Sequence, residues 1–100
     1  MLGLLAGARI LDLSHMLAGP FGSMMLGDLG AEVIKVEPPE GDPMRQMGPH
    51  FYATESAYYL SANRSKKSIT LNLQSENGRA VFYDLVKAAD VVYDNFRPGV

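Results

Sequence analysis

Short apolar runs alternate along this chain with segments in which apolar residues recur every three or four positions. Four runs have the length and composition of strands: residues 8–13, 31–36, 68–73 and 90–93. Three intervening segments have helical periodicity, with approximate bounds at residues 20–29, 54–62 and 76–89. Because strands alternate with helices, the sequence predicts an α/β fold, with a parallel sheet and flanking helices.

Residues at the borders of these segments predict where the helices begin and end. Gly19 and Pro20 suit the N-cap and the first position of the first helix, because proline has no N–H to leave unpaired and its φ is already helical. Gly30 suits a left-handed stop after that helix. Thr54 and Ser75 are the predicted caps of the next two helices.

The segment 38–51 is rich in proline and glycine, which exclude a regular helix or a central strand. We predict a loop here, and we expect it to be functional or to cover another part of the protein, because it is long for a simple connection. In the helix that follows, Tyr58, Tyr59 and Leu60 are expected to face inward.

Composition and charge narrow the class of protein. A chain of 100 residues with 47% hydrophobic and 20% charged residues is expected to be soluble and globular. Its net charge of −2 argues against a dedicated nucleic-acid binder. The sequence has no cysteine, which excludes a disulfide framework and a thiolate nucleophile and suits a cytoplasmic location. No apolar run approaches the roughly 18 residues of a membrane helix, so we expect no membrane partner.

The turn Ser14–Pro20 is the first candidate site, because open parallel sheets bind ligands beyond the carboxyl ends of their strands and at helix N-termini. At the end of the strand before it, Asp12 is expected to accept hydrogen bonds from amides of the turn. Cations in the run Arg64–Lys67 and at Arg97 could clamp phosphate, although such a run can also simply face solvent. A phosphate-bearing cofactor therefore fits.

Other kinds of site lack their motifs. Neither G-x-x-x-x-G-K-[ST] nor G-x-G-x-x-G is present, so Glu37, placed after the second strand to bind a ribose hydroxyl, has no glycine fingerprint beside it. Ser14 and His15 are neighbours, but a serine nucleophile of a catalytic triad would need the G-x-S-x-G motif, which is absent here. His15 and His50 have no recognisable carboxylate partners for a metal. Residue types alone leave the function unresolved beyond anion binding.

Four stretches together resemble the class III CoA-transferase family, which includes formyl-CoA transferase, carnitine CoA-transferase and alpha-methylacyl-CoA racemase. They stand in the family's order and at the family's spacing: LDLSHMLAGPF, LGDLGAEVIKVEPPEGDPMR, YYLSANRSKKSITLNL and ADVVYDNFRPGV. The resemblance implies that residues 1–100 are the N-terminal part of a large domain with a Rossmann-like parallel sheet. It further implies a small domain later in the chain and a homodimer of interlocked subunits.

The resemblance also implies an activity, which is the transfer of CoA from an acyl-CoA to a small carboxylic acid. The nucleophile would be an Asp beyond Val100, so no catalytic residue is expected within this chain and the chain alone is expected to be inactive. No metal is expected. A CoA-binding role is implied for six residues: His15, Ala18, Leu71, Asn95, Phe96 and Arg97. Ordinary structural roles are the alternative, with His15 ordering its turn and with Leu71 and Phe96 in the core.

Two residues depart from the pattern of formyl-CoA transferase. Leu17 replaces a glutamine involved in that enzyme's small-acid chemistry, and Pro38 replaces an arginine that contacts CoA. Phosphate contacts are then expected from Arg45 or from the run Arg64–Lys67. The first turn differs from that of racemase members and favours a transferase. An acyl-CoA racemase and a non-catalytic CoA- or nucleotide-binding module remain the alternatives.

Overall fold

A four-stranded parallel sheet organises the protein, in a computed structural model that describes residues 3–48, 50–52 and 55–98. The strands are β1 (Arg9–Asp12), β2 (Glu32–Glu37), β5 (Lys66–Thr70) and β6 (Val91–Tyr93), in the spatial order β5-β2-β1-β6. β1 lies in the centre and pairs in parallel with both β2 and β6. In chain order this is 3-2-1-4, the order of one half of a Rossmann-like sheet, so the predicted α/β fold is confirmed.

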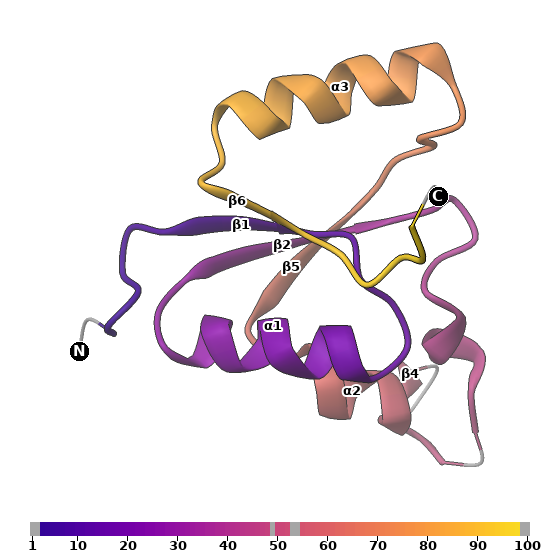
Figure 1. The fold of residues 1–100 in the computed structure, drawn as a ribbon. Coiled ribbons are helices and arrows are strands. Elements are labelled where there is room, and N and C mark those ends of the chain that lie inside the picture. Colours follow the sequence, from indigo (N-terminus) through magenta and orange to yellow (C-terminus); the bar gives the residue numbers. More distant parts are fainter. Residues whose placement is uncertain (1–2, 49, 53–54, 99–100) are drawn as a thin grey trace.

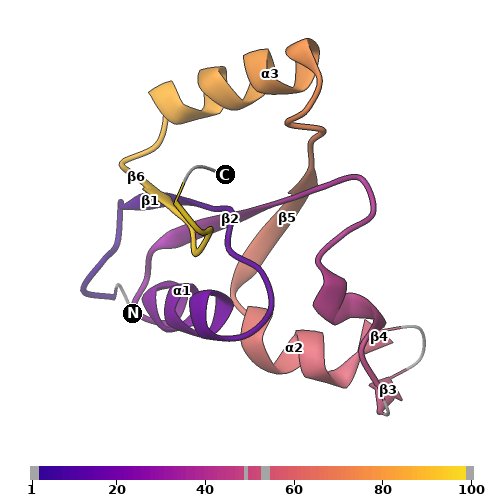
Figure 2. The same ribbon diagram turned by 45° about the vertical axis from the view of Figure 1, so that its right-hand side comes forward.

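Helices lie on both sides of the sheet. Figure 1 shows α1 (Ala18–Asp28) and α2 (Ala57–Asn63) on one side and α3 (Glu76–Lys87) on the other. A buried cluster of Ile10, Ala31 and Val33 is packed against Leu26 of α1. On the opposite side no residue of α3 is buried, and the second view shows this helix standing away from the strands (Figure 2). The packed core therefore lies on the side of α1 and α2.

The first helix begins two residues earlier than predicted. Leu17 is its N-cap residue, without a side-chain capping bond, and the amide of Phe21 donates the first helical hydrogen bond to the carbonyl of Leu17 at 2.8 Å. The prediction that Gly19 caps the helix is therefore wrong, and Pro20 lies at the third position. Proline is tolerated there because none of the first N–H groups of a helix has an intrahelical partner. The stop at Gly30 is confirmed, with φ of +107°.

The third strand of the sheet also begins earlier than the alternating pattern predicted. β5 starts at Lys66, which pairs with Val33, and ends at Thr70, which pairs with Glu37. The basic residues Lys66 and Lys67 therefore belong to the strand and not to a turn. This placement is possible because Lys66 pairs with Asp12 and Lys67 pairs with Glu32. Leu71 follows the end of β5.

The predicted loop 38–51 contains one turn of 3-10 helix, η1 (Pro43–Gln46), and ends in β3 (Phe51–Tyr52), which pairs antiparallel with β4 (Glu55–Ser56). Ser56 caps α2 by accepting a hydrogen bond from the amide of Tyr59 at 3.3 Å. The predicted cap Thr54 lies outside the described residues.

Further side-chain predictions had mixed outcomes. Tyr59 is buried as expected, Leu60 is exposed, and the side chain of Tyr58 is not among those described. Ser75 caps α3 as predicted, because its hydroxyl accepts from the amide of Gly78 at 3.0 Å. Among the residues that the structure describes, no helix is long and apolar enough to cross a membrane.

Candidate functional site

Two turns meet where the strand order reverses, beyond the carboxyl ends of β1 and β6. The backbone amide of His15 donates to the side-chain oxygen of Asn95 at 3.3 Å, and the side-chain nitrogen of Asn95 donates to the carbonyl of His15 at 3.0 Å. The ring of His15 lies 5.7 Å from that of Phe96. His15 is thus a neighbour of Asn95, which lies 80 positions later in the chain, and of Phe96. All three predicted site residues lie at the place where open α/β sheets bind ligands.

The residue after His15 has an unusual backbone conformation. Met16 has φ of 69°, in the left-handed region that costs a non-glycine residue roughly 1 kcal/mol or more. Asn95 holds the residue before it, and the carboxylate of Asp42 accepts from the amide of Met16 at 3.3 Å. Contacts from two distant loops therefore fix this turn, and the strain lies next to the candidate ligand site.

A pocket of about 890 Å³ opens beside these turns, in the size range of small-molecule sites. Its lining comes from β2, η1, α3 and the segments that follow β1, β2, β5 and β6: Leu13, Ser14, His15, Val36, Glu37, Pro38, Pro39, Glu40, Asp42, Pro43, Leu71, Asn72, Leu73, Gln74, Arg79 and Phe96. Of the six predicted residues, His15, Leu71 and Phe96 line it. Asn95 supports it through His15, while Ala18 and Arg97 are exposed residues outside its lining.

Asp12 lies buried under the first turn, at the end of β1. Its carboxylate accepts from the amide of Ser14 at 2.9 Å and from the hydroxyls of Ser14 and Ser23, and the ammonium of Lys66 lies 3.0 Å away. The expected bond from a turn amide is present. The sequence did not indicate that a lysine from β5 would neutralise this charge.

Asn63, at the end of α2, connects Lys66 to a second buried ion pair, which Lys35 forms with Asp42. Its side-chain oxygen accepts from Lys66 at 2.8 Å and from Lys35 at 2.9 Å. Lys35 in turn lies 2.6 Å from Asp42, and both side chains are only 1% exposed. Buried charges require partners of this kind, and removing one partner leaves the other uncompensated. The network therefore supports the turn of His15, through Asp12 at Ser14 and through Asp42 at Met16.

Glu37 at the end of β2 is a structural carboxylate in this arrangement. It accepts two hydrogen bonds from Arg45, both at 2.7 Å, and further bonds from Ser68, the hydroxyl of Tyr59 and the amide of Asp42. Burial by itself raises the pKa of Glu37, but the bonds from Arg45 and Ser68 outweigh it and hold the pKa at about 2. Protein groups donate to both carboxylate oxygens, so Glu37 has a structural role that needs no ribose hydroxyl.

The phosphate clamp suggested for the run 64–67 gains no support from the geometry, because each of its cations has a carboxylate partner. Arg64 lies 2.8 Å from Asp28, and Lys67 lies 2.9 Å from Glu32. Lys66 is buried in the network described above, and this burial lowers its pKa despite the neighbouring carboxylate. The alternative of a solvent-facing turn is wrong for Lys66, because this residue lies in β5 with its side chain buried.

The sequence analysis missed five polar residues that line the pocket: Glu40, Asp42, Asn72, Gln74 and Arg79. Arg79 belongs to the first turn of α3, and its guanidinium donates to the carbonyl of Leu73 at 3.1 Å. One sequence signal could have found it, because the first turn of a helix that follows the carboxyl end of a parallel strand faces the ligand edge.

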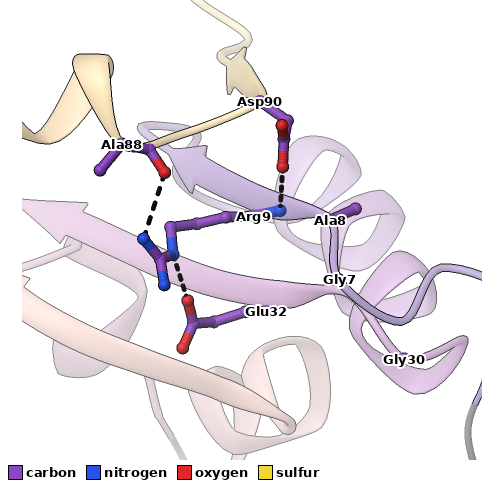
Figure 3. A pocket seen from close by; sticks show the side chains of 7 residues that line it. All are labelled: Gly7, Ala8, Arg9, Gly30, Glu32, Ala88 and Asp90. Atoms are coloured by element: carbon purple, nitrogen blue, oxygen red, sulfur yellow. Dashed lines mark hydrogen bonds and ion pairs between the residues drawn. The ribbon is translucent and has the colours of Figure 1, made fainter.

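A second, smaller pocket of about 510 Å³ lies at the amino ends of the strands (Figure 3). Arg9 crosses it, pairs with Glu32 and donates to the carbonyl of Ala88 at 3.1 Å, while its backbone amide donates to Asp90 at 2.8 Å. These bonds fasten the start of β6 to β1 and β2. Among the described residues no group of His, Asp and Glu side chains is placed to hold a metal ion.

Comparisons with known proteins agree with this geometry. The model of the family described as "CoA-transferase family III" matches residues 5–100. The chain is 54% identical over 96 residues to the human succinyl-CoA:glutarate CoA-transferase, a match that covers 95% of the chain and 22% of the relative. It is 50% identical over 95 residues to the acetyl-CoA:oxalate CoA-transferase of Acetobacter aceti, covering 94% of the chain and 24% of that protein.

Solved structures show the same arrangement of elements. A CAIB/BAIF family protein from Brucella suis superposes with a TM-score of 0.91 at 43% identity, over 99% of this chain and 27% of that one. A hypothetical protein from Mycobacterium tuberculosis gives a TM-score of 0.88 at 44% identity, over 97% of this chain and 26% of that one. The chain spans about a quarter of the length of these relatives.

Proposed function

The chain belongs to CoA-transferase family III, and on that premise we propose that the protein containing it transfers CoA from an acyl-CoA to a carboxylic acid. The single observation that carries the proposal is the meeting of His15, Asn95 and Phe96 beside a pocket at the carboxyl ends of the strands. That position is where parallel α/β sheets bind phosphate-bearing ligands.

The acceptor proposed here is a dicarboxylic acid. The names of the relatives specify glutarate, oxalate, D-citramalate, L-malate and mesaconate, and each of these is a dicarboxylate. Succinyl-CoA or acetyl-CoA serves as the donor in the same names. Leu17, where formyl-CoA transferase has a glutamine, agrees with an acid different from that enzyme's substrate.

The proposed chemistry uses an Asp beyond Val100. Its carboxylate attacks the thioester carbonyl, so a mixed anhydride forms and CoA leaves as the thiolate. The thiolate attacks the aspartyl carbonyl, which gives an enzyme-CoA thioester and frees the donor acid. The acceptor carboxylate then repeats these two steps in reverse and leaves as the new acyl-CoA. A carboxylate nucleophile suits this exchange because its anhydride remains activated, so the thioester energy is kept.

The described residues supply the wall of the CoA site in this proposal. His15, Leu71 and Phe96 line the pocket, and Asn95 holds the turn of His15 in place. Ala18 and Arg97 stay candidate contacts to the ends of the cofactor that lie outside this pocket. His15 and Asn95 are the members of the set whose positions depend on each other.

The organisation of the whole protein is part of the same proposal. Residues 1–100 form the N-terminal part of a large domain, and two copies of the complete protein form an interlocked homodimer in the cytoplasm. The quarter-length match to the relatives supports the first point. The L-malate enzyme of Chloroflexus aurantiacus is named by alpha and beta subunits, so a heteromer is the competing assembly. The chain expressed alone is expected to expose the edges of its sheet, to self-associate and to be inactive.

Trapping the covalent intermediate tests the function. The full-length protein is incubated with succinyl-CoA and hydroxylamine and examined by mass spectrometry. A hydroxamate on one Asp is the expected result, because hydroxylamine intercepts an aspartyl anhydride or thioester. Turnover of acyl-CoA without a hydroxamate would refute the transferase route. Deuterium uptake from D₂O next to the thioester, without transfer of CoA, would establish the racemase instead.

A further inference from the structure

Arg79 occupies a position in the pocket that no other described cation shares. Among the residues lining the pocket beside His15, it is the one Arg or Lys. Its neighbours in the lining include Asn72 and Gln74, which are neutral, and Glu40. We infer that Arg79 binds a phosphate group of CoA, an assignment that rests on the proposed function and adds a contact to it.

Ion pairing of the other cations supports this assignment. Arg45, Arg64, Lys66 and Lys67, which the sequence offered as phosphate contacts, each have a carboxylate within ion-pair distance. Arg9, Lys35 and Lys87 are paired as well. Of the Lys and Arg side chains in the part of the chain that the structure describes, Arg79 and Arg97 have no carboxylate at that distance. Arg97 does not line the pocket.

The guanidinium of Arg79 is held in place without being neutralised. One of its nitrogens donates to the carbonyl of Leu73 at 3.1 Å, which fixes the side chain against the segment after β5. An arginine has five N–H donors in a fixed planar arrangement that matches the oxygens of a phosphate. A single bond to a carbonyl leaves both the charge and most of this donor set for a ligand.

Two of the three carboxylates in the pocket wall are paired with cations, and the third, Glu40, is exposed to solvent and has no ion pair among the described residues. The carboxylates of Glu37 and Asp42 belong to the lining, but Arg45 and Lys35 pair with them. Pro38, which stands where formyl-CoA transferase has its CoA-contacting arginine, contributes no charge. Arg79 thus provides, from α3, a positive group in the lining, to which the loop after β2 contributes no cation.

Calorimetric titration of the full-length protein tests the assignment with three probes: CoA, 3′-dephospho-CoA and pantetheine, which has no phosphate. Arg79→Gln removes the charge but keeps a donor for the carbonyl of Leu73. Lys87→Gln removes one charge from the other end of α3, where the side chain is exposed, and serves as the matched control. Arg79→Lys keeps the charge without the planar donor set, and circular dichroism checks that each variant is folded.

Arg79→Gln is expected to raise the Kd for CoA roughly 10- to 100-fold, the effect of losing a charge-assisted contact. Arg79→Lys recovers part of this loss, and Lys87→Gln leaves the Kd within about 2-fold. Full binding of 3′-dephospho-CoA by Arg79→Gln assigns the contact to the 3′-phosphate, whereas an equal loss with both nucleotides assigns it to the diphosphate.

Two results would overturn the assignment. One is an unchanged Kd for CoA in Arg79→Gln, and the other is an equal loss with pantetheine, which has no phosphate to contact. The proposed function fails separately, if the wild-type protein binds none of the three probes.

Discussion

Lys35 is the residue whose replacement tests the buried network most directly. Its ammonium lies 2.6 Å from Asp42 and 2.9 Å from the side-chain oxygen of Asn63, in a place where Lys35 and Asp42 are both 1% exposed. Methionine has nearly the length of lysine, so Lys35→Met removes the charge while it leaves little cavity. The variant therefore isolates the cost of an uncompensated carboxylate.

The expected loss follows from what remains around Asp42. The amides of Met44 and Met16 still donate to its carboxylate, at 2.9 and 3.3 Å, but no other described cation lies within ion-pair distance of it. Breaking a buried pair from one side costs about 3 to 5 kcal/mol. That is a large part of the roughly 5 to 15 kcal/mol of a typical domain. Because Asp42 also holds Met16, the turn of His15 is expected to loosen as well.

Urea unfolding of the full-length protein, followed by far-UV circular dichroism, measures this loss. The control is Lys67→Met on the neighbouring strand, where the lysine is 72% exposed and pairs with Glu32 at 2.9 Å. Its removal is expected to cost about 0 to 1 kcal/mol. The double variant Lys35→Met/Asp42→Asn should recover at least about 1 kcal/mol of the loss. If Lys35→Met costs no more than Lys67→Met, the reasoning about the buried charge is refuted.

Two further predictions concern Glu37 and Asn95. The folded-state pKa of Glu37, about 2, lies below its ordinary value of 4.5, so its contribution is complete above pH 4.5 and is lost as the pH falls toward 2. We expect that contribution to be about 3 kcal/mol. Urea midpoints of wild type and Glu37→Gln should therefore converge between pH 4.5 and 2; a constant difference would contradict this. Asn95→Ala should raise KM for acyl-CoA several-fold, because the turn of His15 loses both side-chain bonds. An unchanged KM in a folded variant would remove Asn95 from the site.

Local patterns predicted most of the fold. The apolar runs around Leu11, Val33 and Val92 are strands, Ser75 caps α3, and Gly30 ends α1. These outcomes depend on a few neighbouring residues, so the sequence contains them directly. The predicted helix boundaries were wrong by a few residues where two neighbouring start positions have similar energy. Pro20, for example, is tolerated at several positions of a first helical turn.

Partners between distant residues could not be predicted in the same way. Nothing near Lys66 in the sequence shows that it enters the sheet, because the carboxylate that permits its burial belongs to Asp12, 54 positions earlier. Arg45 and Glu37 similarly looked available for ligands until the structure paired them.

The sequence by itself determined the α/β alternation, the family and the candidate turns around His15 and Asn95. Tertiary structure decided which charged groups hold the protein together and which face the pocket, because pairing depends on the order β5-β2-β1-β6 and on the loops that this order brings together. The opening turn, Ser14–Pro20, contains both contributions. Its residues mark the ligand edge, while Asp42 and Asn95, from distant loops, hold its strained backbone in place.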